Sequence, residues 1–89
     1  MDAFNSTQIA FAREDAAYII GISKQVSSPD HRKVGAELEE CFRRSADSDS
    51  VTLDLQIYRV QLLLEMMQQY STRKDLLRQV LQHASKERD

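Results

Sequence analysis

The chain has 89 residues, enough for one domain with a modest core but close to the size at which a partner subunit often adds stability. Its formal charge of −2 is typical of neither a basic nucleic-acid-binding protein nor an acidic tail, and its two glycines and one proline disfavour a loop-rich fold. The single cysteine, Cys41, excludes an internal disulfide framework and favours a reducing compartment, so we expect a cytoplasmic location.

The abundance of Leu, Gln, Glu, Ala and Arg favours helices over sheets, so we predict an all-α fold in which residues 1–89 form a single domain. The first residues are acidic and lack a long apolar stretch, so we expect no cleavable signal peptide. Nowhere does an apolar run approach the roughly 20 residues of a membrane span. We therefore expect no transmembrane segment.

The first predicted helix covers about residues 6–25. Asn5 is suited to cap it, and Gln8, three residues later, completes a capping box. Ala17 and Gly21 lie four residues apart and would leave a shallow strip where another backbone can approach closely. We expect this strip to be a packing contact.

The second predicted helix covers about residues 29–45. Ser28 is a suitable N-cap, Pro29 is preorganised for the first helical position, and Asp30 suits the positive end of the helix dipole. The residues that follow, 45–50, are small and polar, and their side chains favour a loop that ends in the next helix cap.

The third predicted helix covers about residues 51–86. Residues 51–57 alternate between apolar and polar as a strand would, but we find no second alternating run to pair with them and therefore predict helix. A continuous helix over 51–86 would be about 54 Å long at 1.5 Å per residue, which suits an intertwined dimer. Alternatively, the chain breaks at 71–74, where Thr72 caps a fourth helix and a four-helix bundle results. We favour the continuous helix and a three-helix bundle.

Residues 53–70 form the most apolar stretch of the chain. Five of its residues repeat at alternating spacings of four and three and would form one face of a helix, and further apolar residues flank them. Because this surface exceeds what one neighbouring helix covers, we predict a homodimer with coiled-coil packing. The predicted interaction surface consists of Leu53, Ile57, Val60, Leu64 and Met67, the flanking Leu55, Leu62, Met66 and Tyr70, and the continuation Leu77 and Leu81.

The sequence provides no candidate catalytic, cofactor-binding or metal-binding residues. His31 and His83 have no partner at ligand spacing, and Cys41 shares an apolar stripe with Leu38 and Phe42, which predicts a core residue. The second predicted helix carries several glutamates where a helix-turn-helix protein would place phosphate contacts, which disfavours nucleic acid. We expect no enzyme activity and no cofactor.

Three groups of residues form a pattern: Lys33-Val34 before Leu38 and Phe42, Ser48-Asp49, and Ile57-Tyr58-Arg59 leading to Leu64-Glu65-Met66. With these residues the chain resembles, over about residues 14–70, the small biofilm and acid-resistance regulators of enterobacteria, also described as two-component connector proteins; the stretch 71–89 departs from their pattern. This resemblance implies a helical dimer that regulates through protein contacts. Gln68 to Ser71 is also similar to a segment of small needle and rod components of type III secretion.

These observations predict a small bacterial, non-enzymatic interaction module, a regulator that binds another protein as a homodimer. One alternative is a type III secretion component or its small chaperone. Another is a weak, dimeric DNA-binding regulator.

Overall fold

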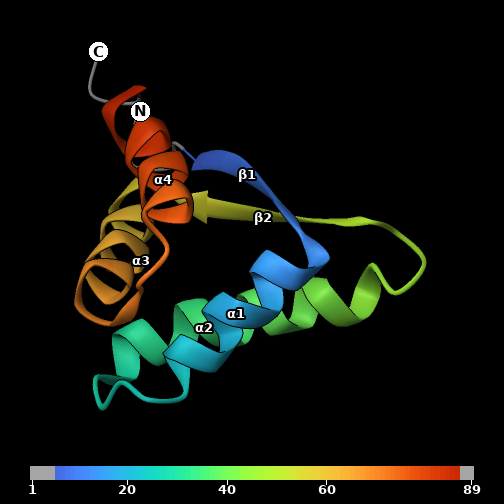
Figure 1. Cartoon of the computed structure of the whole chain (residues 1–89), viewed down its shortest axis with the longest axis horizontal. Helices are drawn as coiled ribbons and strands as arrows, with labels where there is room; N and C mark the ends of the chain where they lie inside the picture. The colour runs from blue at the N-terminus through green and yellow to red at the C-terminus, as the bar shows by residue number, and fades with distance from the viewer. Residues whose placement is uncertain (1–5, 87–89) are drawn as a thin grey trace.

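The structure, a computed structural model, describes residues 6–86 and is an α+β fold, so the predicted all-α helical bundle is wrong (Figure 1). Two strands and four helices follow one another in the order β-α-α-β-α-α. The elements are β1 (Ser6–Ala12), α1 (Arg13–Ser23), α2 (Pro29–Arg44), β2 (Ser50–Gln56), α3 (Ile57–Tyr70) and α4 (Lys74–Lys86).

Strand β1 occupies the first seven residues of the segment predicted as a helix over 6–25. Ile9 and Phe11 are buried, whereas Gln8 and Ala10, which alternate with them, are exposed, and this is the two-residue period of a strand. Helix α1 begins only at Arg13. The predicted cap, Asn5, lies outside the described residues. Two buried side chains in seven residues are a weak strand signal, and the predicted helix did not take this alternation into account.

Strand β2 occupies the start of the segment predicted as a helix over 51–86. It pairs antiparallel with β1, and Ile9 is the cross-strand partner of Leu53. The alternation of residues 51–57 was therefore a true strand signal, which the absence of a partner run wrongly excluded. That partner run is β1 itself, 44 positions earlier in the chain.

Helix α2 is present almost as predicted, from Pro29 to Arg44, with Pro29 in its first turn. Ser28 precedes it, but its hydroxyl makes no capping bond and instead lies 2.8 Å from His31 Nδ1. The polar segment after α2 is a loop, as predicted, but it leads into β2 at Ser50 and not into the predicted helix cap. In it the Ser50 amide donates to the Ser48 hydroxyl over 3.2 Å.

The continuous C-terminal helix is also wrong, because the chain turns between Tyr70 and Lys74. Ser71 has an extended backbone, with φ −83° and ψ 137°. Its hydroxyl accepts the Arg73 amide over 3.0 Å, so a side chain replaces the helical bonding of the backbone. The break, predicted as the alternative, separates α3 from α4.

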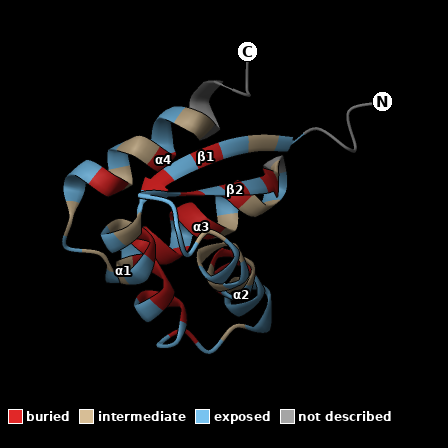
Figure 2. Ribbon diagram, turned by 90° about the vertical axis from the view of Figure 1, so that its right-hand side faces the viewer, coloured by how far each residue is buried: buried red, intermediate tan, exposed pale blue. Residues whose placement is uncertain are grey.

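The helices cover one face of the two-stranded sheet, and the other face is exposed (Figure 2). A single cluster of buried apolar side chains lies between the sheet and the helices. Its largest fully buried members are Phe11, Ile9, Ile19, Leu38, Leu53, Leu55, Leu63, Met66, Met67, Leu76, Val34 and Val51.

The chain consists of two similar β-α-α halves. A shift of 44 positions moves β1 onto β2 and the start of α1 onto the start of α3. The residues before the two helices, Ala12 and Gln56, have nearly the same backbone angles, φ −62° and −65° with ψ 152° in both. Every residue from 14 to 25 is buried, half-buried or exposed like its equivalent in 58–69. The repeat lies in the burial pattern rather than in residue identity.

Within the first half, α1 and α2 approach closely at Gly35. A Cβ at Gly35 would overlap the buried Ser23 side chain of α1, whereas a Cβ at Gly21 would meet nothing within 4 Å. The close approach predicted for the strip of Ala17 and Gly21 is therefore wrong, since both residues are exposed. The close approach is at Gly35 instead, where the absence of a side chain leaves room for Ser23.

Candidate functional site

The structure buries most of the predicted interaction surface within the chain itself. Leu62 and Leu77 are half-buried, Tyr70 and Leu81 are 38% and 46% exposed, and the Ile57 side chain is not among those described. The surplus apolar surface that motivated the predicted dimer is thus covered by β1 and the other helices. Of the predicted interaction surface, six residues are 4% exposed or less: Leu53, Leu55, Val60, Leu64, Met66 and Met67.

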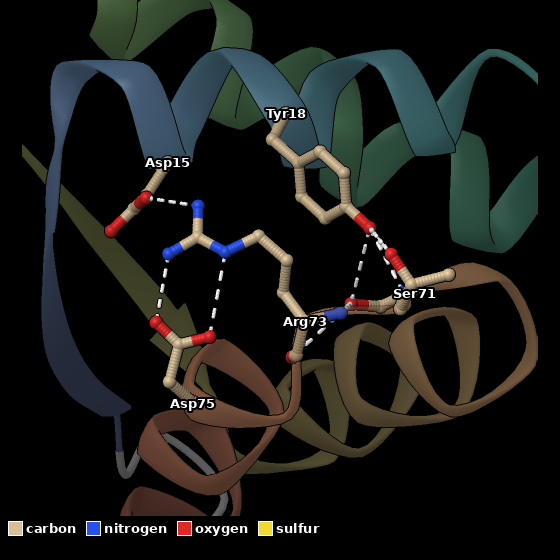
Figure 3. Close-up of polar contacts among 6 residues, drawn as sticks. Asp15, Tyr18, Ser71, Arg73 and Asp75 are labelled. Carbon is tan, nitrogen blue, oxygen red and sulfur yellow. Dashed lines mark hydrogen bonds and ion pairs between the residues drawn. The ribbon is translucent and has the colours of Figure 1, made fainter.

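The repeat creates two equivalent interfaces between the halves, at which a first helix meets the turn before the other half's second helix. In one interface α1 meets the turn 71–73 (Figure 3). The Tyr18 hydroxyl accepts the Thr72 amide over 2.9 Å and lies 3.5 Å from Ser71 Oγ. These hydrogen bonds lower the pKa of Tyr18 to about 8, and the bond with Ser71 has the largest effect.

Arg73 closes the same interface from its other side. Its guanidinium donates to Asp15 over 2.6 Å and to Asp75 over 2.8 Å, and lies 5.8 Å from the centre of the Tyr18 ring (Figure 3). The hydrogen bond from Arg73 holds the pKa of Asp75 below its usual value, and Asp75 and Asp15 raise the pKa of Arg73. Arg73 therefore pairs with both aspartates beside the Tyr18 ring, and we call these four residues the Tyr18–Arg73 cluster.

The second interface, between α2 and α3, is built differently. At the position equivalent to Tyr18 it has Leu62, which cannot bond the turn, and at the position equivalent to Asp15 it has Arg59, which pairs with Glu37 of α2. His31 Nε2 lies 3.0 Å from Glu65 Oε1, so a second polar side-chain contact joins α2 to α3. His31 and Glu65 were not paired by sequence reasoning because 34 positions separate them.

Two hollows lie along this second interface, one on each side of the His31–Glu65 contact. We call them together the α2–α3 groove. The larger, of about 320 Å³, is lined by Asp30, Lys33, Tyr58, Arg59 and Leu62. The smaller, of about 160 Å³, is lined by Val26, Ser27, Ser28, His31, Met66, Gln69 and Tyr70.

An exposed tyrosine stands at each end of the α2–α3 groove. Tyr58 is 65% exposed and Tyr70 38%, and together with Leu81 they are the large apolar side chains left exposed among the described residues. Tyr70 belonged to the predicted interaction surface, and Tyr58 did not. The signal that would have found Tyr58 is its position on α3, one turn before Leu62 of the predicted interaction surface.

Several charged side chains outside the α2–α3 groove, on α2 and at the end of α1, are paired with one another. Glu40 contacts both Arg43 and Arg44, and Lys24 contacts Glu39. Cys41 is half-buried and packs against the core, and His83 Nδ1 lies 3.5 Å from the Thr7 hydroxyl. Within residues 6–86 no three His, Cys, Asp or Glu side chains gather in a way that would hold a metal ion.

Comparison of the chain with protein-family models, curated proteins and solved structures found no match. No helix in the described part of the chain is both long and apolar enough to cross a membrane. The all-helical fold implied by the resemblance to connector regulators is not the fold observed.

Proposed function

We propose that this protein is a small interaction module that binds another protein in the α2–α3 groove. The observation that carries the proposal is the pair of exposed tyrosines, Tyr58 and Tyr70, at the two ends of a hollowed helix–helix interface. Tyrosine buries a large apolar ring at low entropic cost and still offers a hydroxyl, which makes it a frequent anchor in protein interfaces.

The chemistry of the groove favours a protein partner over a nucleic acid or a small molecule. Its cations are balanced by acids, since Arg59 pairs with Glu37 and Lys33 lies near Asp30. A surface of this balance gives no net attraction for phosphates. The hollows are also shallow and polar, unlike the enclosed apolar pockets that bury a small ligand.

The proposed partner contact differs from the predicted homodimer surface. Leu64 and Met67, at the centre of that surface, are buried in the single chain and are not available to a second protein without unfolding. Of the predicted interaction residues, Leu62 and Tyr70 line the α2–α3 groove and are still accessible, whereas Met66 lines it from the core and is 1% exposed. The proposal retains Leu62 and Tyr70 and adds Tyr58.

Site-specific photo-crosslinking in cells of the source organism tests the proposal. A benzophenone side chain is placed at Tyr58 and, as the matched control, at Glu14, its exposed equivalent on α1. We expect a discrete protein adduct from position 58, reduced by Tyr70→Ala, and none from position 14. Equal adducts from both positions, or none from position 58, would contradict a partner site in the groove.

A further inference from the structure

The two halves of the chain are joined only by the short polar turn Ser45–Asp49, yet they share one core. The sheet itself is formed between halves, because β1 belongs to the first and β2 to the second. The helix pairs α1–α2 and α3–α4 each lie within one half. Each half therefore carries an apolar face that is covered by the other half of the same chain.

The turn Ser45–Asp49 is held in place by one side chain of α1. The Arg13 guanidinium donates to the Ser45 carbonyl over 2.5 Å and lies 3.5 Å from the Ser48 carbonyl. It also stacks on the Phe42 ring of α2, with 4.0 Å between Arg13 Cζ and the ring centre, a contact that lies within the first half. The charged hydrogen bonds from Arg13 to the turn carbonyls stabilise the turn in its closed form.

We propose that two copies of this chain exchange β-α-α halves, with the turn Ser45–Asp49 as the hinge and Arg13 as the clasp that favours the closed monomer. In the exchanged dimer, β1 of one copy pairs with β2 of the other, and every contact between halves is reproduced. The proposal does not depend on the function proposed for the α2–α3 groove.

The two forms differ in few terms, which makes the exchange thermodynamically accessible. The buried contacts between halves are the same in both, so the balance depends on chain concentration, on the conformation of the hinge and on the contacts of Arg13. Opening the hinge exposes only residues that are already half-buried or exposed, since Ser45 is half-buried and residues 46–49 are exposed.

The register of the sheet provides a direct test. The Arg13 amide donates to the Asp49 carbonyl over 3.2 Å, which extends the pairing of β1 with β2 by one pair and shows that Arg13 and Asp49 form a hydrogen-bonded pair. Pairs alternate in an antiparallel ladder, so Ala10 and Thr52 form a non-hydrogen-bonded pair, whose Cα atoms lie about 4.5 Å apart. Both residues are exposed, and this spacing accepts a disulfide.

Two full-length chains, each with Cys41→Ala, carry either Ala10→Cys or Thr52→Cys, and one of them has a size tag. They are mixed in denaturant, refolded at high concentration and mildly oxidised. Random collision of an equal mixture gives as much 10–52 product as the 10–10 and 52–52 products together, and exchange predicts a 10–52 product in clear excess over that sum. A 10–52 product no more abundant than the sum of the two like products overturns the proposal.

Arg13→Gln tests the clasp in the same assay. We expect it to raise the ratio of exchanged dimer to monomer about tenfold, the effect of losing a charged hydrogen bond. Arg43→Gln, which removes only an exposed ion pair with Glu40, is the control and should leave the ratio unchanged. An equal ratio in Arg13→Gln and Arg43→Gln would refute the role of Arg13.

Discussion

Ile9 and Leu53 are cross-strand partners, and each is also the central residue of its own seven-residue strand. They are equivalent under the 44-position repeat, so the approximate twofold axis that relates the two halves passes between them. The two side chains are 0% and 1% exposed. The centre of the repeat is thus also a centre of the hydrophobic core.

Truncation at this centre should destabilise the whole domain. Ile9→Ala and Leu53→Ala each remove a fully buried side chain, and we expect each to lower the free energy of unfolding by about 2–5 kcal/mol. Because the two residues contact each other, the double variant should cost measurably less or more than the sum. Urea unfolding of the wild type, the two single variants and the double variant measures this. A difference of less than about 0.5 kcal/mol between the loss in the double variant and the sum of the two single losses would contradict the pairing.

Leu64→Asp separates a core role from an interface role for the predicted interaction surface. Leu64 is 4% exposed, so an aspartate there places an unpaired charge in the core and should unfold the monomer. Leu81→Asp is the control, since Leu81 is 46% exposed and should tolerate the change. Circular dichroism during heating gives the result. A Leu64→Asp protein that melts like the wild type would contradict the burial of this residue.

The two glycines should respond to alanine in opposite directions. Gly35→Ala drives a methyl group into Ser23 and should lower the melting temperature, whereas Gly21→Ala meets open space and should stabilise helix α1 by roughly 0.5–1 kcal/mol. Adding Ser23→Gly to Gly35→Ala should restore part of the loss, because both clashing atoms belong to the Ser23 side chain. Thermal melts of these three variants and the wild type are sufficient, and stabilisation by Gly35→Ala would show that the helices do not approach there.

Tyr18 should titrate below the ordinary pKa of a tyrosine. Hydrogen bonds to Ser71 and Thr72 lower its pKa from 10.0 to about 8, so an absorbance titration should show one tyrosinate forming near pH 8, which Tyr18→Phe removes. A folded-state pKa below the unfolded one contributes stability that is fully present above about pH 10 and lost as the pH falls through about 8.

The stability of the wild type relative to Tyr18→Phe should therefore increase as the pH rises from about 8 to about 10. Tyr70→Phe is a control that leaves the Tyr18–Arg73 cluster intact. If no tyrosinate that Tyr18→Phe removes forms near pH 8, the turn 71–73 is not held by Tyr18 in the way described.

Local signals in the sequence were sufficient where one residue type fixes the backbone. Pro29 after two serines predicted the start of α2, and the small polar residues after Arg44 predicted the turn. The break after Tyr70 was visible as an alternative, because Ser71 and Thr72 compete with helical backbone bonding. These features depend on contacts between near neighbours in the chain.

The sheet could not be predicted in the same way because its two strands lie far apart in the sequence. Ile9 and Phe11 also fit a helical pattern, and their strand character depends on Leu53, which no local rule connects to them. Likewise, Tyr58 and His31 became candidate site residues only after α2 was placed against α3. Tertiary pairing overrode local propensity at both places.

The antiparallel pairing of β1 with β2 is the central claim, because it buries the predicted dimer surface and leaves the α2–α3 groove as the exposed interface. Nuclear Overhauser spectroscopy tests it directly at Ala10 and Thr52, whose Hα atoms face each other in a non-hydrogen-bonded pair. We predict a strong Hα–Hα contact between these two residues and helical amide contacts that begin at Arg13 and Ile57. Continuous helical amide contacts through residues 51–57, with no contact between Ala10 and Thr52, would contradict it.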